Sequence, residues 1–238
     1  MRMKLTYIYH SCFVMESEKF TLIFDYYKDS EEKYIHEHLA DFPGKLYVFS
    51  SHSHRDHFNP DILKWKNSRS DIQYILSKDI VDHELYKGDE AFIIDKLETF
   101  SDGLLTVKAF GSTDLGVSFL VEANGKKIFH AGDLNNWHWK EESTGEEVRE
   151  AENFYLSELA HLVNESQHLD VLMFPVDHRL GNGYTRGAEQ LLDKIKVDLF
   201  VPMHFWEHYA DANAFAQKVE AYGSQFFAIH KQGDCISF

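Results

Sequence analysis

The sequence predicts one α/β domain over residues 1–238, rich in β-strands and covered by helices. Three observations lead to this fold class. The length of 238 residues suits one domain or two fused halves that share a core, and the 44% of hydrophobic residues can fill such a core. Strand-like and helix-like segments also alternate along the second half. No linker, repeat or low-complexity segment divides the chain.

The first half is expected to consist mainly of strands. Apolar and aromatic runs predict them at 4–25 (two or three short ones), 46–50, 72–77 and 91–94. A short helix is predicted between Ser30 and Leu39. Another helix is predicted to begin at Asn59 or Pro60. Proline suits the first turn of a helix, because the backbone N–H that it lacks would have no hydrogen-bond partner within the helix there.

The second half is expected to alternate. Strands are predicted at 104–110, 117–123, 126–131, 170–175 and 198–202, followed by two closing strands, and helices at 145–168, 185–196 and 211–222. Asn124-Gly125 indicates a tight hairpin turn, since both residues tolerate a positive φ. The long helix is amphipathic, and we expect it to cover a sheet with Phe154, Leu156, Leu159 and Leu162.

Charge and composition restrict the partners. The 24 basic and 39 acidic side chains give a formal charge of −15, which argues against nucleic acid and leaves a small molecule as the expected partner. No apolar run approaches the roughly 18 residues of a membrane span, and Met1-Arg2-Met3-Lys4 leads into a strand and not into a signal peptide. Cys12 and Cys235 are expected to be buried free thiols, which predicts a cytoplasmic protein. The oligomeric state stays open.

One motif stands out, the run Ser51-His52-Ser53-His54-Arg55-Asp56-His57 that follows the strand at 46–50. Residues two apart in an extended chain point to the same side, so His52 and His54 can face one point. After the chain turns, Asp56 and His57 can face a neighbouring point. Imidazole nitrogens and carboxylates are ligands for zinc and similar divalent metals, which predicts a metal site rather than a solvated histidine-rich loop.

Several motifs together resemble the metallo-β-lactamase superfamily. They are the H-x-H-x-D-H run, His130-Ala131-Gly132-Asp133, Pro202-Met203-His204-Phe205, and the opening hairpin Tyr9-His10-Ser11-Cys12-Phe13-Val14-Met15-Glu16 with Leu22-Ile23-Phe24-Asp25. The opening hairpin resembles the branch that includes sugar-phosphate lactonase-like proteins. The resemblance spans nearly the whole chain. It implies a four-layer αββα sandwich with a metal site at one edge, between two sheets.

The resemblance also implies two metal positions. The first position would draw on His52 and His54, and the second on Asp56, His57 and His204. Asp133 would bridge them, because a carboxylate has two oxygens. The alternatives are a turn or helix cap for Asp133 and a core histidine for His204. The expected metal is Zn²⁺, with Mn²⁺ or Fe²⁺ as alternatives, at one or two ions per chain.

One ligand of that pattern is missing. The superfamily usually supplies a third histidine to the first position from the loop after the strand at 104–110, but here the loop reads Phe110-Gly111-Ser112-Thr113-Asp114-Leu115-Gly116. Asp114 is one candidate substitute, although the alignment leaves its place open. A histidine introduced at Ser112 or Thr113 is expected to strengthen the first position.

Other residues are candidates for support and recognition. Asp25 is expected to accept the second N–H of a ligand imidazole, or else to be a turn residue. His10 is expected to contact metal or substrate and to take part in catalysis, with hairpin packing as the alternative. Asn135, Trp137 and His138 are expected to bind substrate, unless they form a surface loop anchored by tryptophans. Arg179 would bind a phosphate or carboxylate, or else pair with Asp177.

These features predict a metal-dependent hydrolase. Metal-activated water would attack an ester, lactone or phosphodiester of a small molecule, and Asp56 would orient the water and move its proton. The alternative is a catalytically degenerate member of the fold that binds metal or a small ligand without turnover. The missing histidine favours that alternative.

Overall fold

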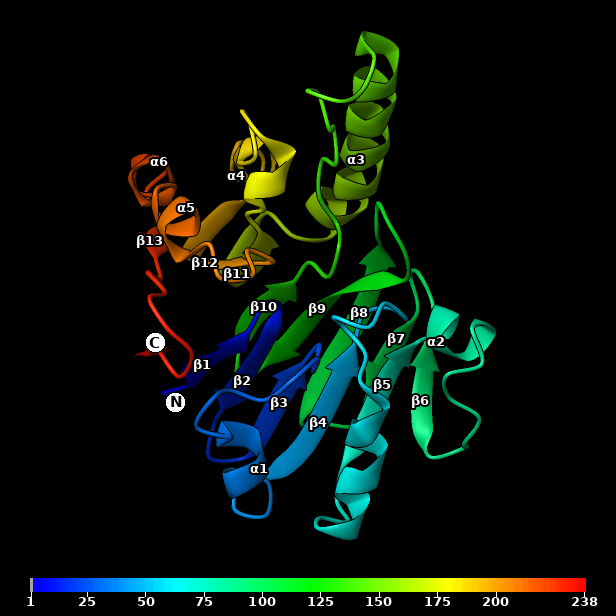
Figure 1. Cartoon of the computed structure of the whole chain (residues 1–238). Coiled ribbons are helices and arrows are strands. Elements are labelled where there is room, and N and C mark those ends of the chain that lie inside the picture. The colour runs from blue at the N-terminus through cyan, green and yellow to red at the C-terminus, as the bar shows by residue number, and fades with distance from the viewer. Residues whose placement is uncertain (1) are drawn as a thin grey trace.

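The computed structural model describes residues 2–238, which form two seven-stranded sheets packed face to face (Figure 1). The first sheet runs, in spatial order, β14 (Cys235–Ser237), β1 (Lys4–Tyr9), β2 (Cys12–Glu16), β3 (Phe20–Phe24), β4 (Lys45–Ser50), β5 (Gln73–Ser77) and β6 (Ala91–Ile94). The second runs β13 (Gln225–Phe226), β12 (Lys196–Met203), β11 (His168–Pro175), β10 (Lys126–His130), β9 (Val117–Ala123), β8 (Leu105–Gly111) and β7 (Thr99–Ser101).

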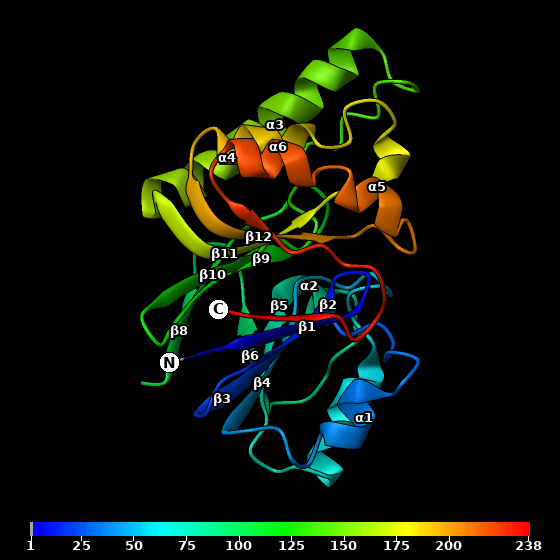
Figure 2. The ribbon, with the colours of Figure 1, turned by 90° about the vertical axis from the view of Figure 1, so that its left-hand side faces the viewer.

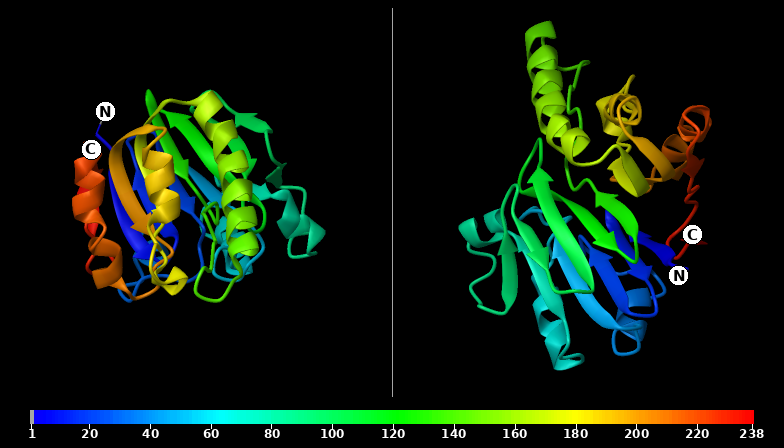
Figure 3. Two further views of the ribbon diagram at one scale, coloured as in Figure 1. Left: turned by 90° about the horizontal axis from the view of Figure 1, so that it is seen from above. Right: turned by 180° about the vertical axis from the view of Figure 1, so that it is seen from behind.

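Helices cover the outer face of each sheet, so the fold has four layers (Figure 2). On the first sheet lie α1 (Tyr34–His38), the 3₁₀ helix η1 (Pro60–Asn67) and α2 (Lys78–Asp82). On the second sheet lie α3 (Gly145–Glu165), α4 (Arg186–Leu192), α5 (Tyr209–Asn213) and α6 (Ala216–Ala221), side by side in Figure 3. The αββα class expected from the motifs is confirmed.

Strand alternation divides the apolar residues between two cores. In β4, Tyr47 and Phe49 face the core between the sheets, whereas Leu46 and Val48 face the core under α1 and η1. A strand buried on both faces must be apolar at every position, which is why 46–49 is a continuous apolar run. None of these four residues is measurably exposed.

Parallel pairing brings the functional segments to one edge. Strands β3 to β6 are parallel in the first sheet, and β10 to β13 are parallel in the second. The carboxyl ends of β3, β4, β10, β11 and β12 therefore lie at the same edge, where site residues of α/β folds gather. His204 donates its backbone N–H to the carbonyl of His10 over 3.2 Å and so ties the two sheets together at this edge.

Most predicted elements are present, with some corrections. Asn124 and Gly125 have φ values of 52° and 72° and form the expected turn between β9 and β10. The helix predicted at 145–168 ends at Glu165, because β11 begins at His168, and the one predicted at 211–222 is two short helices. Phe154 was expected to cover the sheet but is 49% exposed; the neighbouring Tyr155 is buried in its place.

Both cysteines are free, but only one of them is buried. Cys12 lies in β2 and is inaccessible, whereas Cys235 is exposed on the edge strand β14, contrary to expectation. Within residues 2–238, no helix combines the length and apolar character needed to cross a membrane.

Candidate metal centre

The H-x-H-x-D-H motif lies in the loop that leaves β4 and is held close to neighbouring backbone. Val117 donates its N–H to the carbonyl of Ser51 over 2.9 Å. Gly116 next to it has a φ of +64°, and a Cβ there would lie 2.1 Å from that same carbonyl oxygen. Gly132 has a φ of +52°, and a Cβ there would lie 2.9 Å from the Cβ of Ser51. Only glycine fits both positions, because any side chain would collide with Ser51.

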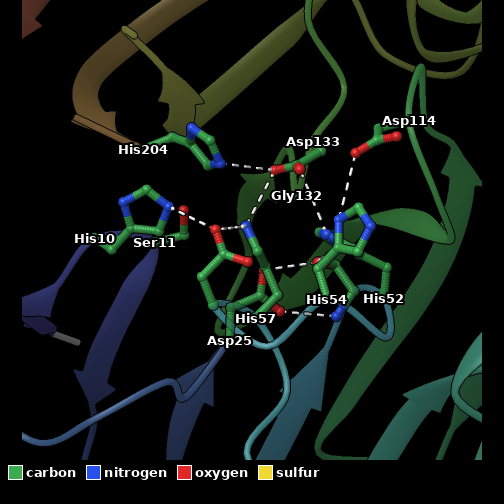
Figure 4. A network of polar contacts seen from close by, with 12 residues as sticks. His10, Ser11, Asp25, His52, His54, His57, Asp114, Gly132, Asp133 and His204 are labelled. Carbon is green, nitrogen blue, oxygen red and sulfur yellow. Dashed lines mark hydrogen bonds and ion pairs between the residues drawn. The ribbon is translucent and has the colours of Figure 1, made fainter. Parts of the chain in front are cut away.

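Three polar residues at this edge have left-handed backbone. His10 follows β1 with φ 57°, Asp25 follows β3 with φ 44°, and His204 follows β12 with φ 60°. A residue with a Cβ adopts this conformation at a cost of roughly 1–3 kcal/mol, and such strain persists where the surrounding structure over-determines it. Each strand ends at a residue that turns its side chain toward the space between the sheets (Figure 4).

The second metal position is a buried group of three imidazoles and one carboxylate. His10, Asp56, His57 and His204 each offer one ligand atom, and these four atoms lie within 4.8 Å of one another. Asp56 Oδ2 lies 3.3 Å from His10 Nε2 and 3.9 Å from His57 Nε2. The structure thus brings together the three residues expected from the motifs and adds His10.

The first metal position is more open. His52, His54, Asp114 and Asp133 offer ligand atoms that also lie within 4.8 Å of one another. Asp114 Oδ2 is 3.4 Å from His54 Nδ1, and each of these two side chains is 46% exposed. His52 is fully buried. The group contains the two expected histidines together with Asp114 from the loop after β8.

Asp133 stands between the two positions, just after β10. Its Oδ2 lies 3.4 Å from Nε2 of His52, in the first position. Its Oδ1 lies 3.2 Å from Nε2 of His57 and 3.4 Å from Nε2 of His204, in the second position (Figure 4). One carboxylate therefore presents a different oxygen to each group, which is the arrangement that a bridging ligand needs.

Several nitrogen and oxygen atoms that face the centre make no hydrogen bond within residues 2–238. Both ring nitrogens of His10, Nε2 of His52 and of His57, and Oδ1 of Asp133 are buried and unpartnered. Buried polar atoms are normally paired, because an unpaired one costs roughly 1–3 kcal/mol. Imidazole nitrogens and carboxylate oxygens are also the donors that divalent metals take. The residues present therefore fit the metal ions that the fold implies.

Carboxylates fix the opposite nitrogens of two ligand imidazoles. Nδ1 of His57 lies 2.7 Å from Oδ2 of Asp25, and Nδ1 of His204 lies 3.0 Å from Oδ2 of Asp177. Asp25 also accepts from the N–H and hydroxyl of Ser51, both at 2.7 Å. Such partners set the tautomer of a ligand histidine and raise its basicity. Asp25 thus lies where it was expected.

The close packing of these groups shifts their protonation. Burial alone would raise the pKa of Asp133, but the imidazoles of His57, His204 and His52 around it hold that pKa well below its ordinary value. Burial and the neighbouring His204 lower the pKa of His10 to about 3, so its ring is neutral and one of its two nitrogens keeps a lone pair for a metal. For His52, burial is outweighed by Asp133, which raises the pKa to about 9. A bound cation would compete with that proton.

A cavity of about 420 Å³ opens onto the centre. It is lined by His54, Asp56, Thr113, Asp114, Asp133, Trp137, Trp139, Arg179 and His204. Trp137 and Trp139 are stacked 6.2 Å apart with an interplanar angle of 14° and form an aromatic wall. Arg179 pairs with Asp177, with Nε at 2.9 Å from both carboxylate oxygens. It also lines the cavity, and its binding of a phosphate or carboxylate stays a prediction.

Two expected substrate contacts lie elsewhere. Asn135 is fully buried, and its Oδ1 accepts the backbone N–H of Asn136 at 2.8 Å. His138 is 2% exposed, and its Nε2 lies 3.1 Å from the carbonyl of Gly183. Neither residue lines the cavity. The tight loop after Asp133 turns both side chains into the protein, so the contact role expected for them is not supported by their position.

Comparison with known proteins agrees with this architecture. Residues 4–204 match the family model described as a Beta-lactamase superfamily domain, so the chain belongs to that superfamily, as the motifs indicated. A "UPF0173 metal-dependent hydrolase" from Desulforamulus reducens is 26% identical over an alignment 238 positions long, gaps included, that covers 92% of each chain.

Solved structures share the fold at lower identity. Igni18, a metallo hydrolase from Ignicoccus hospitalis, superposes with a TM-score of 0.70 at 19% identity, over 100% of this chain and 99% of that one. CmlA, a diiron β-hydroxylase from Streptomyces venezuelae, gives a TM-score of 0.66 at 14% identity, over 99% of this chain and 54% of that one. The fold is thus shared by proteins of different activity.

Proposed function

We propose that this protein is a metal-dependent hydrolase that cleaves an ester, lactone or phosphodiester bond in a small molecule. The observation that carries the proposal is the convergence of buried imidazole and carboxylate atoms without hydrogen bonds around Asp133, which lines one cavity. The name of the D. reducens relative supports the same class of activity.

The residues that would hold the ions are the two groups already described. His10, Asp56, His57 and His204 would hold one ion, His52 and His54 would contribute to the other, and Asp133 would serve both. Zn²⁺ is the metal we expect, with Mn²⁺ or Fe²⁺ as alternatives. When bound, such a cation lowers the pKa of water and polarises the substrate oxygen that becomes negative.

The chain itself supplies proton transfer and orientation. Asp56 lines the cavity beside His10, and although burial opposes its ionisation, the contact with His10 holds the pKa of Asp56 well below its ordinary value. A carboxylate that stays ionised can accept a hydrogen bond from the attacking water and take its proton. His10 is too deeply buried to meet substrate, so we assign it to the metal and not to catalysis directly.

The cavity walls favour a small substrate with a planar or apolar part and an anionic group. The volume of about 420 Å³ lies in the usual range for small-molecule sites. Trp137 offers an apolar face, and Arg179 is the basic side chain at the cavity wall. Because Asp177 already engages both Nε and Nη2 of Arg179, Nη1 is the guanidinium nitrogen left to meet a phosphate or carboxylate.

The proposal is tested by a substrate screen on metal-loaded protein. Nitrophenyl esters, lactones, a bis-nitrophenyl phosphodiester and thioesters would be assayed with added Zn²⁺ or Mn²⁺, and again after chelation. Turnover that is lost with chelator, restored by metal and absent in Asp133→Ala is the expected result. His36→Ala, an exposed histidine on α1, is the matched control and should keep full activity. Metal binding without turnover of any substrate class would instead identify a degenerate, binding-only member of the fold.

A further inference from the structure

Asp114 lies in the loop from which the superfamily usually supplies the third histidine of the first position. It lies in the loop after β8, and its Oδ2 is 3.4 Å from Nδ1 of His54. The same carboxylate belongs to the group of four ligand atoms that lie within 4.8 Å of one another. Figure 4 shows it turned toward His54 across the mouth of the site.

The loop is anchored so that Asp114 faces the centre. The hydroxyl of Thr113 donates to the backbone carbonyl of Asn135 at 2.6 Å, and the N–H of Asn135 donates back to that hydroxyl at 2.9 Å. Ser112 accepts the N–H of Asp114 through its Oγ at 3.2 Å. The Thr113 bonds tie the loop to the segment that carries Asp133, so the two segments that supply the carboxylates of the first position are hydrogen-bonded to each other.

We propose that Asp114 is a metal ligand that replaces the missing histidine, and that it makes the first position more favourable to Mn²⁺, relative to Zn²⁺, than a histidine would. The inference rests on the metal centre proposed above. The first position then has two imidazoles and two carboxylates, whereas the second has three imidazoles with Asp56 and a share of Asp133. Carboxylate oxygens suit Mn²⁺, whereas imidazole suits zinc, copper, iron and nickel.

Charge and exposure lead to the same assignment. Asp114 and Asp133 together carry two negative charges toward the first position, which matches a divalent cation. An exposed ion pair between His54 and Asp114 alone would contribute little to stability, because water screens both charges. Nε2 of His52 beside them is buried, lies 3.4 Å from Oδ2 of Asp133 and makes no hydrogen bond within residues 2–238, so an ion pair at the mouth does not account for it, whereas a bound cation would.

The test compares metal content and not turnover. Full-length protein is depleted of metal and then incubated with equimolar Mn²⁺ and Zn²⁺; the bound ions are counted by mass spectrometry, and Mn²⁺ is followed by electron paramagnetic resonance. Asp114→His should keep two ions but lower the bound Mn²⁺ to Zn²⁺ ratio at least about threefold, since it exchanges an oxygen donor for imidazole. Asp114→Asn should raise the Kd of the more weakly bound ion at least about tenfold, because the amide has no charge.

The control is Asp89→His, which adds a histidine at an exposed aspartate in the loop before β6 and should bind metal as the wild type does. An unchanged Kd in Asp114→Asn, or an unchanged metal ratio in Asp114→His, would overturn the assignment even if the wild type is an active hydrolase. Wild-type protein that binds metal without turnover would refute the hydrolase and leave this test valid. Wild-type protein that binds no metal would refute both.

Discussion

The two candidate metal positions share Asp133 but differ in how the chain supplies the other ligands. In the second position, His10 and His204 directly follow strands of opposite sheets, and their side chains are at most 4% exposed. In the first position, His54 and Asp114 come from loops and are each 46% exposed. Rigid strand ends fix a ligand more closely than loops do. The H-x-H-x-D-H motif thus contributes ligands to one enclosed position and to one open position.

Carboxylates that contact the histidines of the second position make the two positions differ further. His57 and His204 of the second position are each oriented by a buried carboxylate, Asp25 and Asp177. Burial alone would raise the pKa of Asp177, but its bonds to His204 and Arg179 hold that pKa well below its ordinary value, so it stays an acceptor. We therefore expect the second position to bind its ion more tightly than the first.

The largest effect is expected from Asp133, the residue common to both positions. Asp133→Ala should remove both ions and abolish activity, and Asp133→Asn should weaken both sites, because the amide has lost the charge that balances the cations. Loss of a shared ligand should reduce metal affinity by more than the roughly 10–100-fold typical of outer-sphere partners. Elemental analysis of dialysed protein measures this. Wild-type metal content in the alanine variant would place Asp133 outside the coordination sphere.

The next comparison separates the two positions. After extensive dialysis, the wild type should retain about one ion per chain, held by the more complete shell of the second position. His204→Ala should lose that ion, whereas His54→Ala should keep it. Isothermal titration with Zn²⁺ would assign the tight and weak events. Two tightly held ions in the wild type, or equal losses in the two variants, would show that exposure does not decide affinity here.

A smaller effect is expected from the carboxylates behind the ligands. Asp25→Asn and Asp177→Asn keep the size of each side chain but remove its charge, and each should lower the affinity of the second position by roughly 10–100-fold. The Asp25 variant should also destabilise the fold, because Asp25 is fully buried and bonds Ser51 as well as His57. Chelator competition measures the first effect and thermal unfolding the second. Equal affinity in variant and wild type would make these carboxylates purely structural.

Much of the fold could be predicted because its strands have strong local patterns. The apolar run at 46–49 and the Asn124-Gly125 turn each fix an element by composition alone. The elements that escaped prediction are short, such as α2 (Lys78–Asp82) and the edge strand β7 (Thr99–Ser101). Three to five residues carry too little periodicity to stand out, and tertiary contacts determine their structure.

The site could be predicted where one short motif contains it. His52, His54, Asp56 and His57 lie within six positions of the chain, and a strand before them fixes their direction. The role of Asp177 was missed, because it depends on the parallel pairing of β11 with β12, which places Pro175 opposite Met203 and so sets Asp177 near His204. Its position directly beyond a buried strand, like that of Asp25, was the available signal.

The smallest effect is expected at the residues beside Asp114, and it sharpens the account of the first position. From the sequence, a histidine at Ser112 or Thr113 was expected to strengthen metal binding. The structure changes that expectation, because the Thr113 hydroxyl is bonded to the backbone of Asn135 and Ser112 is only 8% exposed. We now expect Thr113→His and Ser112→His to leave metal retention within error of the wild type, in contrast to Asp114→His.

Thr113→Val completes this comparison, because valine keeps the shape of threonine and removes only the hydroxyl. The N–H and carbonyl of Asn135 would both lose their partner, which should lower the free energy of unfolding by about 1–3 kcal/mol. Metal content should fall only slightly, since Asp114 keeps its charge and loses only the anchoring of its loop. Denaturant unfolding of the metal-free protein, paired with elemental analysis, separates the two effects. A stronger loss of metal than in Asp114→Asn would mean that loop anchoring, and not the Asp114 carboxylate, controls the first position.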